Sequence, residues 1–252
     1  MKEQMSPGTQ VMMVLLFFIS AYFIVGPLLF VLFAVVTDLP IPETEDGALD
    51  PLFAYTHAAI HFIAVFIMAI LVFLKVTKQK FNLVFDIAKF SLKYFGIGLL
   101  AFFVFFFAAN YLQVINQWLI DFIPNNSFYQ MRAASEARHN AWFNPDIKSY
   151  FPFAIIIYAV LPAILEELIF RGIIMKNLIK MSGKVHFGVI VSSLLFAAIH
   201  MQPWNLLPMT AMAMLFGYIY HYSKDIRIPM LLHFINNAVQ ISLLFYFPGV
   251  MA

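Results

Sequence analysis

Cysteine is absent from the 252 residues of the chain, and charged side chains are scarce. The absence of cysteine excludes disulfides, thiolate metal sites and cysteine nucleophiles. Charged residues make up 11% of the chain, where a soluble domain has about 25%. Hydrophobic residues make up 63%, which is more apolar surface than a globular core of this length can hide from water. The composition therefore excludes a soluble domain, a disordered chain, a collagen and a coiled coil, and it indicates an integral membrane protein.

Long apolar stretches define the expected membrane spans, because a helix needs about 20 residues to cross the hydrocarbon core. The fifth of six such stretches is about twice that length. It contains Gln202-Pro203-Trp204-Asn205, where proline removes a helix donor, so we expect two helices there and about seven in all. The predicted spans are Val11–Val36, Pro51–Leu74, Tyr94–Ile120, Ser149–Leu165, Val185–Ser223 as a pair of helices, and Ile228–Ala252.

The distribution of lysine and arginine predicts the orientation of these spans. The segment Thr37–His57 has five acidic and no Lys or Arg side chains, whereas Lys75–Lys93 has five lysines and one Asp. The positive-inside rule places the second segment in the cytoplasm, and alternation then places the N-terminus there too. The basic side chains lie in short clusters rather than in one stripe, so membrane lipid is an expected partner and nucleic acid is not.

Three charged side chains interrupt an otherwise apolar helix at Leu165-Glu166-Glu167-Leu168-Ile169-Phe170-Arg171. A charge at bilayer depth costs about 2.5 to 3.5 kcal/mol on insertion scales, so these three need compensation. Glu167 and Arg171 are spaced i and i+4 on one helical face and can form an ion pair. Glu166 points about 100° away without that partner, which makes it a candidate general base. The alternative interpretation is a buried ion network that only fixes helix packing.

Two further polar motifs follow on apolar helices. One is Phe196-Ala197-Ala198-Ile199-His200, and the other is His233-Phe234-Ile235-Asn236-Asn237. His233 and Asn237 are again spaced i and i+4, so an imidazole and a carboxamide project from one face and could bind an oxyanion. Polar bonding between helices is the alternative for all three side chains, and Asn236 could replace Asn237 if the helix is rotated. Three histidines outside the motifs, His61, His186 and His221, are expected to be packing or interfacial side chains.

A hairpin turning at Ser182-Gly183 would bring these motifs together. Glu166 lies about 16 residues before that turn and His200 about 17 after it, so an antiparallel pair places them at nearly equal height. His233 lies only about 7 residues from the turn at Asp225. Glu166, His200 and His233 lie at the same height if the first hairpin projects about 15 Å into the cytoplasm. The site would then lie about 10 Å inside the cytoplasmic face.

In order and spacing, Glu166-Glu167-x-x-x-Arg171, Phe196-x-x-x-His200 and His233-x-x-x-Asn237 resemble the three motifs of the CPBP (Abi) intramembrane proteases, which include the type II CAAX prenyl endopeptidases. The resemblance covers about residues 150–245. It implies that Glu166 and His200 activate a water, that His233 and Asn237 stabilise the oxyanion, and that Glu167 and Arg171 hold the site together. Residues 1–149 resemble the family only in being three membrane helices, and we expect one membrane domain over 1–252.

A metal is an open point at this stage. Glu166, His200 and His233 could form an open zinc site of the kind that hydrolases use. Asn237 is an atypical zinc ligand, however, and the chain has no HExxH helix. We therefore favour a mechanism in which no metal or other cofactor is required.

The predicted function is an intramembrane endopeptidase that acts near the cytoplasmic face of a prokaryotic plasma (inner) membrane. Its substrate would be a peptide or membrane protein of CAAX-like, prenylated or bacteriocin type. Two other classes stay open: a non-enzymatic immunity or partner protein of the same fold, and a proton-coupled carrier that uses Glu166. A carrier should show paired broken helices in inverted repeats, and the sequence has one proline break.

Overall fold

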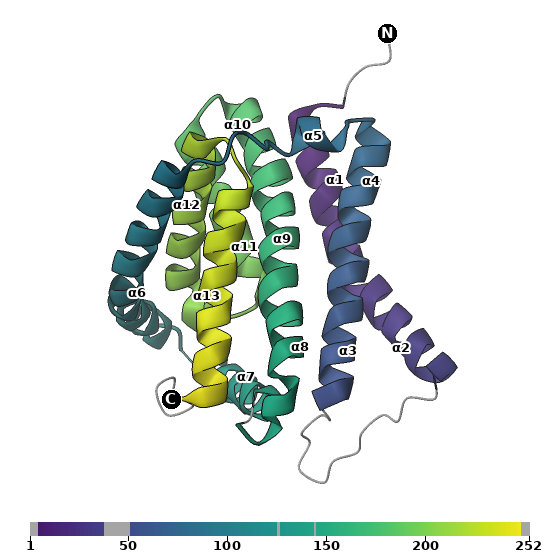
Figure 1. Ribbon diagram of the computed structural model, residues 1–252, viewed down its shortest axis with the longest axis vertical. Coiled ribbons are helices and arrows are strands. Elements are labelled where there is room, and N and C mark those ends of the chain that lie inside the picture. Colours follow the sequence, from purple (N-terminus) through teal and green to yellow (C-terminus); the bar gives the residue numbers. More distant parts are fainter. Residues whose placement is uncertain (1–4, 38–50, 125–126, 144, 248–252) are drawn as a thin grey trace.

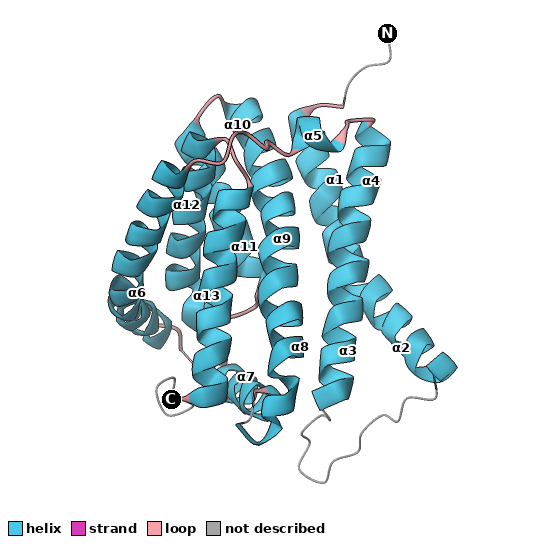
Figure 2. Cartoon of the chain, viewed as in Figure 1, coloured by secondary structure: helices cyan, strands magenta, loops and turns pink. Residues whose placement is uncertain are grey.

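The computed structural model describes residues 5–37, 51–124, 127–143 and 145–247. These ranges are helical and contain no β-strand, only an isolated bridge between Ile87 and Asp225 (Figure 2). The predicted all-α membrane bundle is confirmed. Its α-helices are α1 (Pro7–Ser20), α2 (Gly26–Thr37), α3 (Pro51–Phe62), α4 (Met68–Thr77), α5 (Phe81–Val84), α6 (Leu92–Asp121), α7 (Phe128–Trp142), α8 (Phe151–Ile155), α9 (Leu161–Glu167), α10 (Lys176–Ser182), α11 (Val185–Ile199), α12 (Leu206–Ser223) and α13 (Arg227–Tyr246).

Wide π-helical stretches join several of these α-helices end to end. They are η1 (Ala21–Val25) between α1 and α2, η2 (Ile63–Ile67) between α3 and α4, η4 (Ile156–Val160) between α8 and α9, and η5 (Leu168–Met175) between α9 and α10. The 3₁₀ turns η3 (Pro145–Tyr150) and η6 (Pro203–Asn205) precede α8 and α12. Single π-helical turns are rare and are frequently found at functional sites. The longest of them here, η5, begins directly after Glu167.

The joined helices form seven columns within the described residues: α1–α2, α3–α4, α6, α8–α10, α11, α12 and α13 (Figure 1). Five columns are long and apolar enough to cross a bilayer unaided. The other two, α11 and α12, are the pair expected on either side of Pro203, and α11 has only 15 residues. The segment between the third and fourth spans, expected to be a loop, contains α7.

Two predicted span boundaries are wrong. The span Ser149–Leu165 is too short, because the apolar helix runs from Lys148 to Ser182 without a break. The charged side chains at 166, 167 and 171 do not end this helix, because Glu167 and Arg171 form an ion pair inside the protein. The last span ends at Tyr246 rather than Ala252, and residues 248–252 lie outside the described residues.

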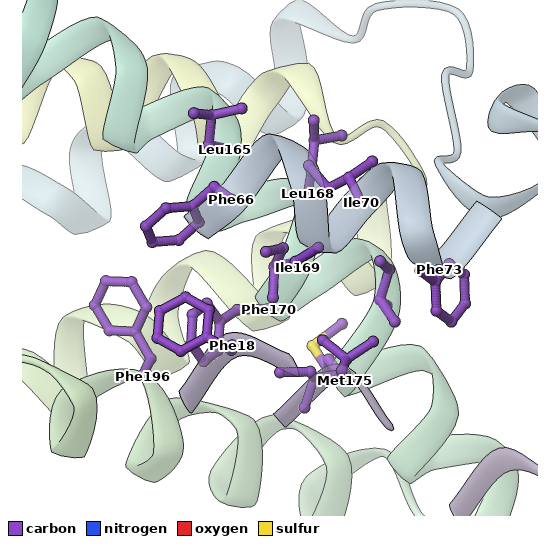
Figure 3. Close-up of a cluster of buried hydrophobic side chains, with 14 of the residues drawn as sticks. Phe18, Phe66, Ile70, Phe73, Leu165, Leu168, Ile169, Phe170, Met175 and Phe196 are labelled. Atoms are coloured by element: carbon purple, nitrogen blue, oxygen red, sulfur yellow. The ribbon is translucent and has the colours of Figure 1, made fainter. Parts of the chain in front are cut away.

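The α8–α10 column is the central helix of the bundle. In its most apolar window 61% of the residues are buried, against 11–33% in the other four candidate spans. All eight residues of η5 are buried. Side chains from this column pack against Phe18 of α1, Phe66 of η2 and Phe196 of α11 in one apolar cluster (Figure 3). The two N-terminal columns therefore cover one face of the central helix.

The basic clusters gather at one end of the bundle. The start of α1, the segment 78–91 and the turns at Gly183 and Lys224 all lie at this end (Figure 1). Lys176 Nζ lies 2.9 Å from Asp86 Oδ1, and Arg227 Nη2 donates to the carbonyl of Ala88 at 2.7 Å. The arrangement agrees with the expected cytoplasmic location of the N-terminus and of the 75–93 segment.

The segment 80–91 crosses this end and braces the central helix. Asp86 accepts from Lys176 of α10 and, at 3.0 Å, from the Tyr220 hydroxyl of α12, while its carbonyl accepts from the amide of Ile226. Phe85 is fully buried against Gly172 of η5. The central helix continues for about two turns, which is about 10 Å, beyond Lys176 and its contact with the 80–91 segment.

Gly172→Ala should destabilise the protein, because the added Cβ would lie 2.4 Å from Cδ1 of the buried Phe85 ring. Overpacking of this kind costs about 1 to 3 kcal/mol, which should appear as a lower melting temperature in detergent. The matched control is Gly96→Ala in α6, where a Cβ would meet nothing within 4 Å. Equal melting temperatures for the two variants would contradict this packing.

Candidate active site

The carboxylate of Glu167 lies at the centre of a buried polar cluster. Its side chain is fully buried, and Oε1 lies 2.9 Å from Nη1 of Arg171, whose side chain is 2% exposed. The predicted ion pair is therefore present. Arg171 also donates from Nη2 to the carbonyl of Ala213 in α12 at 3.0 Å. The pair thus neutralises two charges at bilayer depth and ties the central helix to α12.

The same carboxylate oxygen binds a histidine that the sequence did not connect to it. Nδ1 of His233, in α13, lies 3.0 Å from Glu167 Oε1. Because a carboxylate oxygen accepts, His233 carries its proton on Nδ1 and donates it to Glu167. Glu167 therefore does more than pair with Arg171: it orients the imidazole of His233.

Glu166 lies beside this cluster, as the 100° rotation predicts. Its residue is 5% exposed, and its Oε2 lies 3.8 Å from Nε2 of His233. That separation is too long for a direct hydrogen bond and short enough for a bridging water. Oε2 has no hydrogen-bond partner among the described residues. His200 and His233 both lie close enough to interact electrostatically with Glu166.

The ring of Phe196 brings the three motifs together. The centroids of the His200 and His233 rings lie 4.8 and 5.9 Å from its own centroid. The Arg171 guanidinium lies 4.9 Å from the same centroid, in cation–π contact. The Phe196 ring thus contacts side chains of all three motifs. The spacing Phe196-x-x-x-His200 is the sequence pattern that indicates this contact.

His200 ends α11 and presents one ring nitrogen to the site. Its Nδ1 lies 2.7 Å from the carbonyl oxygen of Phe196, so Nδ1 carries the proton and donates it. Neutral His200 then has its lone pair on Nε2, where it can accept a hydrogen bond from a water or receive a proton.

Asn237 lies one helical turn beyond His233 on α13. Its Oδ1 accepts from Asn236 Nδ2 at 2.9 Å, which leaves the NH₂ group as the donor end of the carboxamide. No hydrogen bond in the described residues joins Asn237 to Glu166, His200 or His233. The structure therefore brings together Glu166, Glu167, Arg171, His200 and His233, and it places Asn237 next to them along the helix without a direct contact.

His61, His186 and His221 lie away from this cluster, as expected. His61 packs on Tyr22 with 4.6 Å between ring centroids, and His186 bonds to the Tyr218 hydroxyl at 2.7 Å. His221 lines a hollow of about 180 Å³ at the basic end, together with lysines of α10 and Lys224.

The residues named for zinc do not form a ligand set. Within the described ranges no three His, Asp or Glu side chains are placed to hold a metal ion together. Nδ1 of His200 and Nδ1 of His233 are both engaged within the protein, which leaves one ring nitrogen on each.

Residues 148–239 match a protein family described as Type II CAAX prenyl endopeptidase Rce1-like. The matched segment is 92 of the 252 residues. It contains all six site residues, so the resemblance seen in the motifs is confirmed.

Two relatives from Bacillus subtilis match nearly the same length. The chain is 34% identical over 92 residues to "Putative membrane peptidase YdiL", covering 36% of this chain and 37% of that protein. It is 36% identical over 89 residues to "Uncharacterized protein YpbD", covering 34% of this chain and 42% of that protein. The chain thus spans less than half the length of either relative. No solved structure matches the chain.

Arg171→Met should lower the yield of folded protein, because it strands the fully buried Glu167 carboxylate at a cost of about 3 to 5 kcal/mol. The matched control is Arg132→Met in α7. Arg132 pairs with Glu136 at the same i, i+4 spacing, but its side chain is 41% exposed. An exposed pair contributes about 0 to 1 kcal/mol, so the control should fold normally. Size-exclusion yield and melting temperature measure both, and equal losses would contradict the buried pair.

Proposed function

We propose that the protein is an intramembrane endopeptidase that hydrolyses peptide bonds with water activated by Glu166. The observation that supports this best is that Glu166 Oε2 lies 3.8 Å from His233 Nε2, while the rings of His200 and His233 both pack on Phe196. A carboxylate and two histidines gathered from three helices can accept, hold and donate protons at one substrate group. The Rce1-like match over the same residues supports the reaction class.

The proposed mechanism uses His233 as an imidazolium, held by Glu167 at Nδ1 with Glu166 near Nε2. The Nε2–H of such an imidazolium is a donor for an oxyanion, which a neutral His233 bonded at Nδ1 cannot supply.

The proposed reaction begins with a water between Glu166 and His200. Glu166 takes one proton from this water, and the lone pair of His200 Nε2 accepts its other hydrogen and holds it in place. The water oxygen attacks the peptide carbonyl carbon, and the oxyanion accepts from His233 Nε2–H and the Asn237 NH₂ group. When the C–N bond breaks, Glu166 gives its proton to the leaving nitrogen.

The depth of the cluster supports cleavage near the cytoplasmic face. His233 lies eight residues beyond Asp225, which is about 12 Å along α13. Glu167 lies nine residues before Lys176, which is about 13 Å along the central helix. Lys176 and Asp225 both contact the 80–91 segment at the basic end. A prokaryotic plasma membrane fits the Bacillus relatives. CAAX-like, prenylated and bacteriocin-type peptides are the proposed substrate classes.

Glu166→Gln should abolish cleavage and leave the folded protein in the membrane, because the amide keeps the shape of the side chain but cannot take the proton. The assay uses purified protein in lipid nanodiscs and quenched-fluorescence peptides ending in a CAAX sequence, with and without a prenyl group. Glu136→Gln, an exposed glutamate of α7, is the control and should cleave normally. Full activity of Glu166→Gln would exclude the proposed base, and a biological role that survives this substitution would favour the immunity or partner alternative.

Removal of metal should leave the activity unchanged, because the proposed proton transfers use only side chains of the chain. After treatment with a strong chelator, cleavage should proceed at the untreated rate, and elemental analysis should find well below one zinc per chain. Stoichiometric zinc, with activity lost on chelation and restored by adding the metal back, would overturn the metal-free mechanism and make Glu166, His200 and His233 its ligands.

A further inference from the structure

The break between α11 and α12 lies directly after His200. α11 has 15 residues, which is about 22 Å, between the hairpin at Gly183 and this break. There the backbone leaves the helix: Met201 adopts a left-handed conformation with φ of 53°, and η6 follows. The helix ends at the break leave carbonyl and amide groups without partners inside their own helices.

One turn of α6 supplies the missing hydrogen bonds. Asn116 donates from Nδ2 to the carbonyl of Pro203 at 2.9 Å, and its Oδ1 accepts from the amide of Leu207 at 2.9 Å. Gln113 donates from Nε2 to the carbonyl of Trp204 at 2.7 Å. Asn116 is 3% exposed and is the only polar side chain buried on α6. It caps the first turn of α12 from another helix, as an N-cap residue does within its own helix.

These hydrogen bonds matter for the proposed reaction because the segment that they hold directly follows His200. His200 is three residues before Pro203, and its ring donates to the carbonyl of Phe196 in its own helix. Glu166 belongs to the central helix. The position of His200 relative to Glu166 therefore depends on where the end of α11 is held.

We infer that Asn116 and Gln113 are positioning residues for His200, and that the third membrane column serves the reaction by tethering the 200–207 segment. The inference rests on the proposed function, in which His200 holds the attacking water. α6 lies outside the Rce1-like residues 148–239, so the match does not describe this contribution. The tether acts on the orientation of the water rather than on substrate binding.

The test combines an activity-independent measurement with kinetics on Asn116→Leu in nanodiscs. Hydrogen exchange should quicken in the peptide covering 200–207, because the Leu207 amide loses its acceptor, and should stay unchanged in 214–223. Cleavage should show kcat lowered by about 10- to 100-fold with KM within about twofold, as expected for a misplaced catalytic group. Gln117→Leu is the matched control: Gln117 bonds to Asp121 and Tyr129, and both readouts should equal those of the parent protein.

Gln113→Leu provides a second variant if Asn116→Leu fails to fold. It removes one of the three bonds and should give the same pattern with a smaller loss of kcat. Quickened exchange with unchanged kcat would overturn the positioning role, as would unchanged exchange in both variants. A parent protein that cleaves none of the peptides would instead refute the proposed function, while the exchange measurement would still report on the tether.

Discussion

The shared carboxylate of Glu167 is the interaction on which the rest of the structure depends. A fully buried anion at bilayer depth is tolerable only when positive or donor groups surround it. Here one oxygen receives both Arg171 of the central helix and His233 of α13, and Arg171 extends the contact to Ala213 of α12 and to the ring of Phe196 in α11. Four columns are thereby joined at one depth, and the side chains of the candidate site are held where those columns meet.

The basic end of the bundle, where the 80–91 segment lies, fixes the height at which this junction forms. Asp86 links α10 to α12, and Phe85 packs against the glycine directly after Arg171. Lys176 lies nine residues from Glu167, and Asp225 lies eight residues from His233. Because both contact the 80–91 segment, Glu167 and His233 meet at the same height. The 80–91 segment, which belongs to no motif, therefore sets the register of the site.

Much of this arrangement could be predicted from local spacing. The i, i+4 pair of Glu167 and Arg171, the rotation of Glu166 and the break near Pro203 all follow from helical geometry and from the chemistry of proline. The predicted fourth span, Ser149–Leu165, is too short. The charged side chains that follow it pair in the interior of the protein, so the helix continues to Ser182. The bond between Glu167 and His233 joins residues 66 positions apart, and no local rule predicts it. Asn116 was missed for the same reason, since its partners lie about 90 residues away in the chain.

Cysteine cross-linking tests the convergence of the motifs most directly, because the native chain has no cysteine. Glu166→Cys combined with His233→Cys should be linked efficiently by a short bifunctional thiol reagent in native membranes. Glu166→Cys combined with His221→Cys is the matched control and should stay unlinked, because His221 lies at the basic end beside Lys224. Efficient linkage of the first pair alone is the result predicted here. Failure of that pair to link in folded protein, or equal linkage of both pairs, would contradict a single site built from Glu166 and His233.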